Sequence, residues 1–110
     1  MNWNKEVIKE SYNKPVIVDF TALWCGPCRF MKPMLLRANK DDSSWSLVFV
    51  DIDDNMSLAS EYEIRSVPTI IGFVNGTPIA GSRGIVSIKE LTEIIKECKI
   101  HHLKEQLIKD

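Results

Sequence analysis

The stretch VIVDFTALWCGPCRFMKP, residues 16 to 33, contains the signals for a strand, a loop and a helix in that order. Residues 16–20 form a short, nearly continuous apolar run, which is typical of a strand buried on both faces. Asp19 is the one charged residue in that run. A helix is expected from Cys25 or Gly26 to about Asn39, because Pro27 suits a first helical turn, where an N–H would have no partner.

The rest of the chain continues the alternation of strands and helices. Further elements are expected as a helix over 2–11, a strand over 46–53, a short helix over 57–62 and a strand over 69–74. Asn75-Gly76 is a strong hairpin signal, so the next strand, over 78–83, should run antiparallel to its predecessor. Ser87 and Glu90 form a capping box for a long last helix. The order predicts an α/β fold in which a mixed central sheet has helices on both faces.

Length and composition limit the possible functions. The chain has 110 residues, 45% of them hydrophobic and 26% charged, and a net charge of −1. We expect one domain over residues 1–110. Without a basic cluster, neither a nucleic acid nor an anionic membrane is an expected partner. No apolar run approaches the roughly 20 residues that span a bilayer, and the polar N-terminus does not resemble a secretory signal, so a reducing cytoplasmic location is expected.

The two cysteines of the CGPC segment predict redox chemistry. Cys25 would lie at a helix N-terminus, where unpaired N–H groups and the helix dipole favour an anion. The thiolate is the nucleophile in disulfide exchange. In the expected cycle, Cys25 attacks a substrate disulfide, and Cys28, one turn along, then attacks Cys25 and releases the reduced substrate.

Two further elements bear on this cycle. Asp19 lies on the strand that precedes the site, and burial should raise its pKa and make it a proton acceptor for Cys28. The alternative is that Asp19 faces solvent or bonds to the backbone. Pro68, between a loop and a buried strand, is a candidate cis proline that would place the Val67 backbone beside Cys25. A trans loop proline is the alternative.

VDFTALWCGPCRFMKP resembles the signature of the thioredoxin family, and the likeness extends over about residues 14 to 97. The segment Phe20-Thr21-Ala22 followed by Trp24 is most similar to eukaryotic cytosolic members. The resemblance implies a thioredoxin fold and a protein-disulfide reductase recharged by thioredoxin reductase, which itself binds NADPH. It implies that Cys25 attacks, Cys28 resolves and Asp19 accepts the proton. It also implies that disulfide-containing proteins dock on a surface formed by Trp24, Gly26, Pro27, Val67, cis-Pro68 and Gly84.

Three departures from the family pattern produce expectations of their own. Few residues precede Asp19, so we expect the first family strand to be missing and the sheet to have about four strands, with 46–53 as an exposed edge. Phe49 stands where many bacterial members carry a lysine, so Asp19 should have no nearby cation and a higher pKa. Beyond Cys98 the apolar residues change to the opposite helix face. The helix should therefore break near 98–102, or its second stripe should meet a partner or fold back; a frayed tail is the other alternative.

The remaining cysteine and the function leave alternatives. Cys98 is interpreted as a small buried hydrophobe, with a regulatory thiol as the alternative. No metal and no bound cofactor are expected; a zinc site from Cys25, Cys28, Cys98 and His101 is formally available but disfavoured, because its ligands would have to converge across the domain. The edge strand or the C-terminal helix could support a homodimer. A redox-dependent binding module using the same surface is the alternative to an enzyme.

Overall fold

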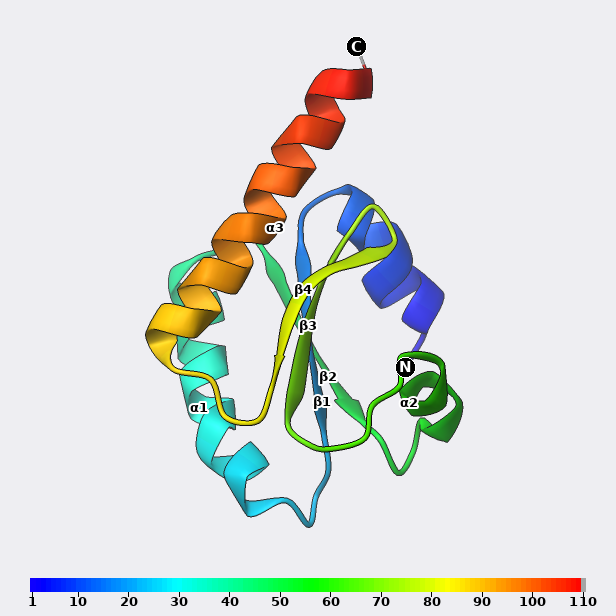
Figure 1. Cartoon of the computed structure of the whole chain (residues 1–110), viewed down its shortest axis with the longest axis vertical. Coiled ribbons are helices and arrows are strands. Elements are labelled where there is room, and N and C mark those ends of the chain that lie inside the picture. Colours follow the sequence, from blue (N-terminus) through cyan, green and yellow to red (C-terminus); the bar gives the residue numbers. More distant parts are fainter. Residues whose placement is uncertain (110) are drawn as a thin grey trace.

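A four-stranded mixed sheet forms the centre of the computed structural model, which describes residues 1–109 (Figure 1). The strands are β1 (Val16–Thr21), β2 (Ser46–Asp51), β3 (Thr69–Val74) and β4 (Thr77–Arg83). Their order in the sheet is β2-β1-β3-β4. β1 and β2 run parallel, whereas β3 runs antiparallel to both β1 and β4. The predicted mixed sheet is confirmed, and β2 is one of its two edges.

Helices cover both faces of the sheet (Figure 1). α1 (Gly26–Asp41) and α3 (Ile88–Lys109) lie on one face. On the other face lie α2 (Met56–Glu61) and the N-terminal segment, in which a π-helix, η1 (Asn4–Lys9), is followed by a 3-10 turn, η2 (Glu10–Tyr12). The N-terminal helix expected from the sequence is therefore present, although it is not a regular α-helix.

The side chains of β1 alternate between two hydrophobic clusters. Val16, Val18 and Phe20 pack with Val7 and Phe73 on the face of η1 and α2. The rings of Trp3, Phe20, Tyr62 and Phe73 contact one another there, at centroid distances from 5.3 to 6.4 Å. Ile17 packs into the cluster beneath α1 and α3. Because successive strand residues point to opposite faces, Asp19 faces the same side as Ile17, toward α1.

Local signals in the sequence account for the ends of several elements. Asn75 and Gly76 both adopt positive φ, 50° and 77°, as a two-residue hairpin turn requires. Ser87 and Glu90 exchange the two hydrogen bonds of a capping box, at 3.2 and 3.1 Å. β2 ends at Asp51, two residues before the predicted end. The Oδ1 of Asp51 accepts a hydrogen bond from the N–H of Asp53 at 2.9 Å, and this side-chain turn replaces strand geometry.

α3 is the extended C-terminal helix expected from the sequence. It runs without a break from Ile88 to Lys109, so a break near residues 98–102, one of the alternatives left open for the residues beyond Cys98, does not occur. Its C-terminal half extends past the end of the sheet (Figure 1). The second apolar stripe does not fold back over the domain: its members are exposed, namely Ile100, Leu103 and Leu107. Cys98 is fully buried beneath the helix, as interpreted from the sequence.

Candidate active site

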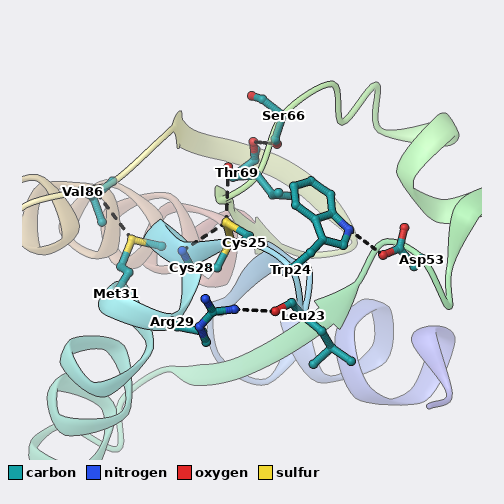
Figure 2. The surroundings of a disulfide bond; sticks show 11 residues. Leu23, Trp24, Cys25, Cys28, Arg29, Met31, Asp53, Ser66, Thr69 and Val86 are labelled. Atoms are coloured by element: carbon teal, nitrogen blue, oxygen red, sulfur yellow. Dashed lines mark hydrogen bonds between the residues drawn. A yellow bond between two sulfur atoms is a disulfide. The ribbon is translucent and has the colours of Figure 1, made fainter.

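Cys25 and Cys28 lie where β1 leads through a short loop into α1 (Figure 2). Cys25 is the N-cap residue of α1, with extended backbone angles, and Gly26 and Pro27 open the helix. The Sγ of Cys25 accepts a hydrogen bond from the N–H of Cys28 at 3.1 Å. Helix N-termini carry unpaired donors and a positive partial charge. The predicted placement of Cys25 at such a terminus is therefore confirmed.

The two sulfurs form a disulfide, with the Cα atoms 5.3 Å apart. Both residues are almost completely buried: Cys25 is 4% exposed and Cys28 is 2% exposed. They pack against Ala22, with Ile52 and Val67 at the border of the cluster. The spacing of the pair thus allows the bond that the proposed exchange chemistry requires.

A cis peptide bond joins Val67 and Pro68, as predicted. The carbonyl oxygen of Val67 lies 3.7 Å from the Sγ of Cys25. The loop is held on both sides, because Thr69 Oγ1 donates to the Ser66 carbonyl at 2.7 Å and the Gly84 N–H donates to the Pro68 carbonyl at 2.8 Å. Pro68 itself is buried. Val67 and Gly84 are half-buried, so the backbone of this loop is partly accessible beside the disulfide.

Exposed apolar side chains surround the disulfide. Leu23 is 83% exposed and Trp24 is 66% exposed, and Gly26 and Pro27 are exposed as well. Large apolar side chains this accessible, grouped around a reactive centre, are typical of a binding surface. The sequence predicted Trp24, Gly26 and Pro27 for this surface but did not single out Leu23.

Two polar contacts fix the loop before α1, and neither was predicted (Figure 2). The indole N–H of Trp24 donates to Asp53 Oδ2 at 2.8 Å. The guanidinium of Arg29 donates to the carbonyl of Leu23 at 2.6 Å. The first contact tethers the loop to the turn after β2, and the second tethers it to α1. In the sequence, the only sign of these contacts is the positive charge of Arg29 next to Cys28.

Asp19 lies fully buried in β1, and neither of its carboxylate oxygens has a hydrogen-bond partner. Burial raises the pKa of this carboxyl from 3.8 to about 7. This rules out the alternative in which Asp19 faces solvent or bonds to the backbone. A carboxyl with a pKa close to neutrality suits proton transfer.

One expectation about Asp19 is wrong. Phe49 does stand beside it in β2, but a cation is near: the charge of Lys32, on α1, lowers the pKa of Asp19 against the larger effect of burial. The ammonium of Lys32 lies 5.2 Å from the centroid of the Phe49 ring. Position 49 of the strand carries no charge, and the cation comes instead from Lys32 on α1, whose ammonium lies over the ring at that position.

Other candidate ligands do not join the site. Cys98 packs against β3, where a Cβ on Gly72 would collide with its sulfur. Within residues 1–109, no group of three or more His, Cys, Asp or Glu side chains could hold a metal ion. No helix in that range is long and apolar enough to cross a membrane.

Comparison with known proteins decides the family. The family model described as Thioredoxin matches residues 1–97. The chain belongs to the thioredoxin family. It is 43% identical over 86 residues to a thioredoxin of Mycoplasmoides gallisepticum, covering 78% of this chain and 86% of that protein. It is 37% identical over 90 residues to the "Bifunctional thioredoxin reductase/thioredoxin" of Mycobacterium leprae, covering 77% of this chain and 20% of that protein.

The fold agrees with solved thioredoxins. The X-ray structure of Fasciola hepatica thioredoxin aligns with a TM-score of 0.76 at 29% identity, covering 82% of this chain and 86% of that chain. This chain is thus a thiol-disulfide oxidoreductase of the thioredoxin family with protein-disulfide reductase activity. Thioredoxins need no bound cofactor, and the Cys25–Cys28 disulfide is the redox-active group.

Proposed function

We propose that Cys25 is the attacking thiol, Cys28 the resolving thiol and Asp19 the proton acceptor of this reductase. The observation that carries the assignment is the position of Cys25 as the N-cap of α1, with its sulfur accepting the Cys28 N–H. In the reduced protein the same N–H and helix terminus favour a thiolate at Cys25.

The exchange then proceeds in two balanced steps. The Cys25 thiolate attacks one sulfur of a substrate disulfide, which forms a mixed disulfide and expels the other substrate sulfur as a thiolate. Asp19 takes the proton of Cys28, and the resulting thiolate attacks the Cys25 sulfur. The second substrate thiolate leaves, and the Cys25–Cys28 bond closes. Two electrons have passed from the dithiol to the substrate.

The docking surface is proposed to comprise Trp24, Gly26, Pro27, Val67, Pro68 and Gly84. The half-buried Val67 has its carbonyl oxygen 3.7 Å from the Cys25 sulfur, and the exposed Trp24 directly precedes Cys25 in the chain. An extended substrate segment can therefore lie across the disulfide and along the loop at Val67, much as a peptide lies along an exposed strand.

We infer that a thioredoxin reductase regenerates the dithiol with two electrons from NADPH. The relative from Mycobacterium leprae, whose name joins both activities in one protein, supports this pairing. A reducing compartment, the cytoplasm, suits a disulfide that must return to the dithiol. We further infer that residues 1–110 act as one domain, with 98–110 as a helical extension whose last residue, Asp110, lies outside the described part of the chain.

Two surfaces are available for a homodimer, which stays a prediction. β2 is an edge strand, and edge strands invite pairing with another chain. The exposed stripe on α3 continues from a groove of about 450 Å³ that α3 forms with Trp45 and the end of α1.

The cycle is tested by measuring how fast the protein catalyses the reduction of insulin, with dithiothreitol as the source of electrons. We expect Cys28→Ser to lose at least about 100-fold in rate, because no thiol remains to release the substrate. Cys98→Ala is the matched control, since it removes a cysteine outside the site and should keep the wild-type rate. Iodoacetamide should also label Cys25 of the reduced protein faster than free cysteine at neutral pH.

Equal insulin-reduction rates for the wild type and Cys28→Ser would exclude the two-cysteine cycle. The exposed Leu23 and Trp24 side chains would then favour the second reading, a redox-dependent binding module that uses the same surface.

A further inference from the structure

The C-terminal half of α3 carries an apolar stripe that the described part of the chain leaves uncovered. The stripe consists of Ile100, Leu103 and Leu107, all of them exposed, Leu107 by 78%. Their spacing of three and four residues places them on one face of the helix. Because this half of α3 extends past the end of the sheet, no other element within residues 1–109 lies over it (Figure 1). A continuous apolar face of this kind marks an interaction site.

The stripe leads into a groove on the same side of α3. The groove has a volume of about 450 Å³ and lies between α3 and the end of α1. Its lining includes the buried side chains of Trp45, Leu91 and Ile95, and it also includes Ile100 and Leu103 of the stripe. The groove and the stripe therefore form one continuous apolar surface.

The charges beside the stripe indicate what covers it. Glu97 and Lys104 are exposed and lie seven residues apart, close to two helical turns, so they share one flank of the stripe. Turning one helix end to end brings equivalent flanks together, so an antiparallel pair of α3 helices sets Lys104 against the partner's Glu97, and does so twice. Lys99, on the other flank, then faces the partner's Gln106 and keeps its salt bridge of 3.0 Å with Asp42. A parallel pair would instead set Lys99 against the partner's Lys104, which is a like charge.

We propose that the stripe and the groove form an interface with a second copy of this chain, in which the two α3 helices pack antiparallel about a two-fold axis. Leu103 packs against the partner's Ile100 on either side of the axis. Leu107 lies level with the partner's Lys96, whose methylene stem gives an apolar edge to the mouth of the groove. The interface rests on the homodimer named under the proposed function and selects α3, not the edge strand β2, as its surface.

This interface leaves both active sites open. The N-terminus of α1, which carries Cys25, and the C-terminus of α3 lie at opposite ends of the molecule (Figure 1). An antiparallel pair of α3 helices therefore places the two disulfides at the far ends of the dimer. Each disulfide can meet a substrate independently, so the rate of insulin reduction per chain should not depend on dimer formation.

Sedimentation velocity of the oxidised protein, from about 5 µM to about 500 µM, tests the interface. We expect the wild type to change from monomer to dimer across this range. Leu107→Glu should weaken the dimer at least about 10-fold, because it buries a charge in an apolar contact. Met56→Glu is the matched control: it changes an equally exposed apolar residue, in α2 on the other face of the sheet, and should leave association unchanged.

Charge variants test the antiparallel direction. Lys104→Glu sets a carboxylate against the partner's Glu97 and should weaken the dimer at least about 5-fold. The double variant Glu97→Lys/Lys104→Glu restores both pairs with their signs exchanged, and should return to within about 2-fold of wild type. Tighter association of Lys104→Glu would indicate a parallel pair that relieves the repulsion from Lys99, and would overturn the antiparallel interface.

The remaining outcomes separate this interface from other surfaces and from the thiol cycle. A wild type that stays monomeric throughout the range would overturn the proposal, and sedimentation with vesicles of phosphatidylcholine and phosphatidylglycerol would show whether a membrane covers the stripe instead. A dimer that Leu107→Glu leaves intact would also overturn it and would favour the β2 edge. Leu107→Glu should reduce insulin at the wild-type rate, whereas failure of the thiol cycle would appear in Cys28→Ser and leave association unaffected.

Discussion

The burial of Asp19 makes the stability of the fold depend on pH. Its pKa is raised from 3.8 to about 7 by burial, so the folded protein holds a proton that the unfolded chain releases at a lower pH. Stability rises with pH only where the unfolded state binds more protons, and here it binds fewer. Asp19 therefore makes no pH-dependent contribution below pH 3.8, destabilises the fold increasingly as the pH rises to about 7, and has its full effect above that.

This linkage predicts the effect of Asp19→Asn on stability. The asparagine is neutral at every pH, so its advantage over wild type should be larger at pH 8 than at pH 4, by up to about 4 kcal/mol for a pKa difference of about 3 pH units. Guanidinium chloride unfolding of the oxidised proteins at the two pH values measures it. The burial cost of the amide is the same at both, so an equal difference between the proteins at pH 4 and pH 8 would contradict a raised pKa.

Residues with local signals could be predicted, and those defined by tertiary contacts could not. Cys25 and the cis Pro68 were recognisable because their roles depend on neighbours within a few residues. Lys32 acts across a helix–sheet interface, where the register of β1 and β2 and the path of a long side chain decide what it meets. Asp53 contacts Trp24 only because β2 stops early and turns.

At the scale of elements, the sheet was predictable because its turns and helix caps depend on residues that are neighbours in the sequence. The hairpin at Asn75-Gly76 fixed the antiparallel pairing of β3 and β4. The extended last helix was predicted, but several alternatives stayed open beyond Cys98, because the sequence does not say whether the second apolar stripe is covered. Extending an existing helix adds a hydrogen bond for each residue ordered, so the helix continues where nothing covers it. Along that extension, the Nε2 of His101 lies 3.7 Å from the Oε1 of Glu105.

The capping box of α3 gives a prediction at this scale. Ser87→Ala removes the oxygen that accepts the Glu90 N–H, and should lower the free energy of unfolding by about 1 kcal/mol. Ser87→Asp, which restores an acceptor, should recover most of that loss. Ser43→Ala, in the exposed turn after α1, is the matched control and should stay within about 0.5 kcal/mol of wild type. Denaturant unfolding measures all three, and similar losses at Ser43 and Ser87 would exclude a specific cap.

At the scale of the whole molecule, α3 is attached through its first half. Leu91, Ile94, Ile95 and Cys98 are buried in the cluster beneath the helix, whereas the residues beyond them are largely exposed. Cys98 packs so closely on β3 that there is no room for a side chain at position 72, which is a glycine. In the oxidised protein, Cys98 is the one free cysteine of the described chain, so its reactivity reports whether α3 stays on the sheet.

This packing predicts how Cys98 reacts with iodoacetamide at pH 8. Burial raises the pKa of its thiol to about 11, so the thiolate is scarce as well as shielded. Labelling of the oxidised native protein should be at least about 1,000-fold slower than labelling in denaturant, because it requires α3 to open. Leu103→Glu, on the exposed extension, should leave the labelling rate unchanged, whereas Gly72→Ala should increase it because the new methyl group displaces the sulfur.

Mass spectrometry of the time course measures the rates of Cys98 labelling. Faster labelling in Leu103→Glu would show that the extension also holds α3 in place, and rapid labelling of the wild type would mean that α3 opens too readily for Cys98 to be a purely structural residue.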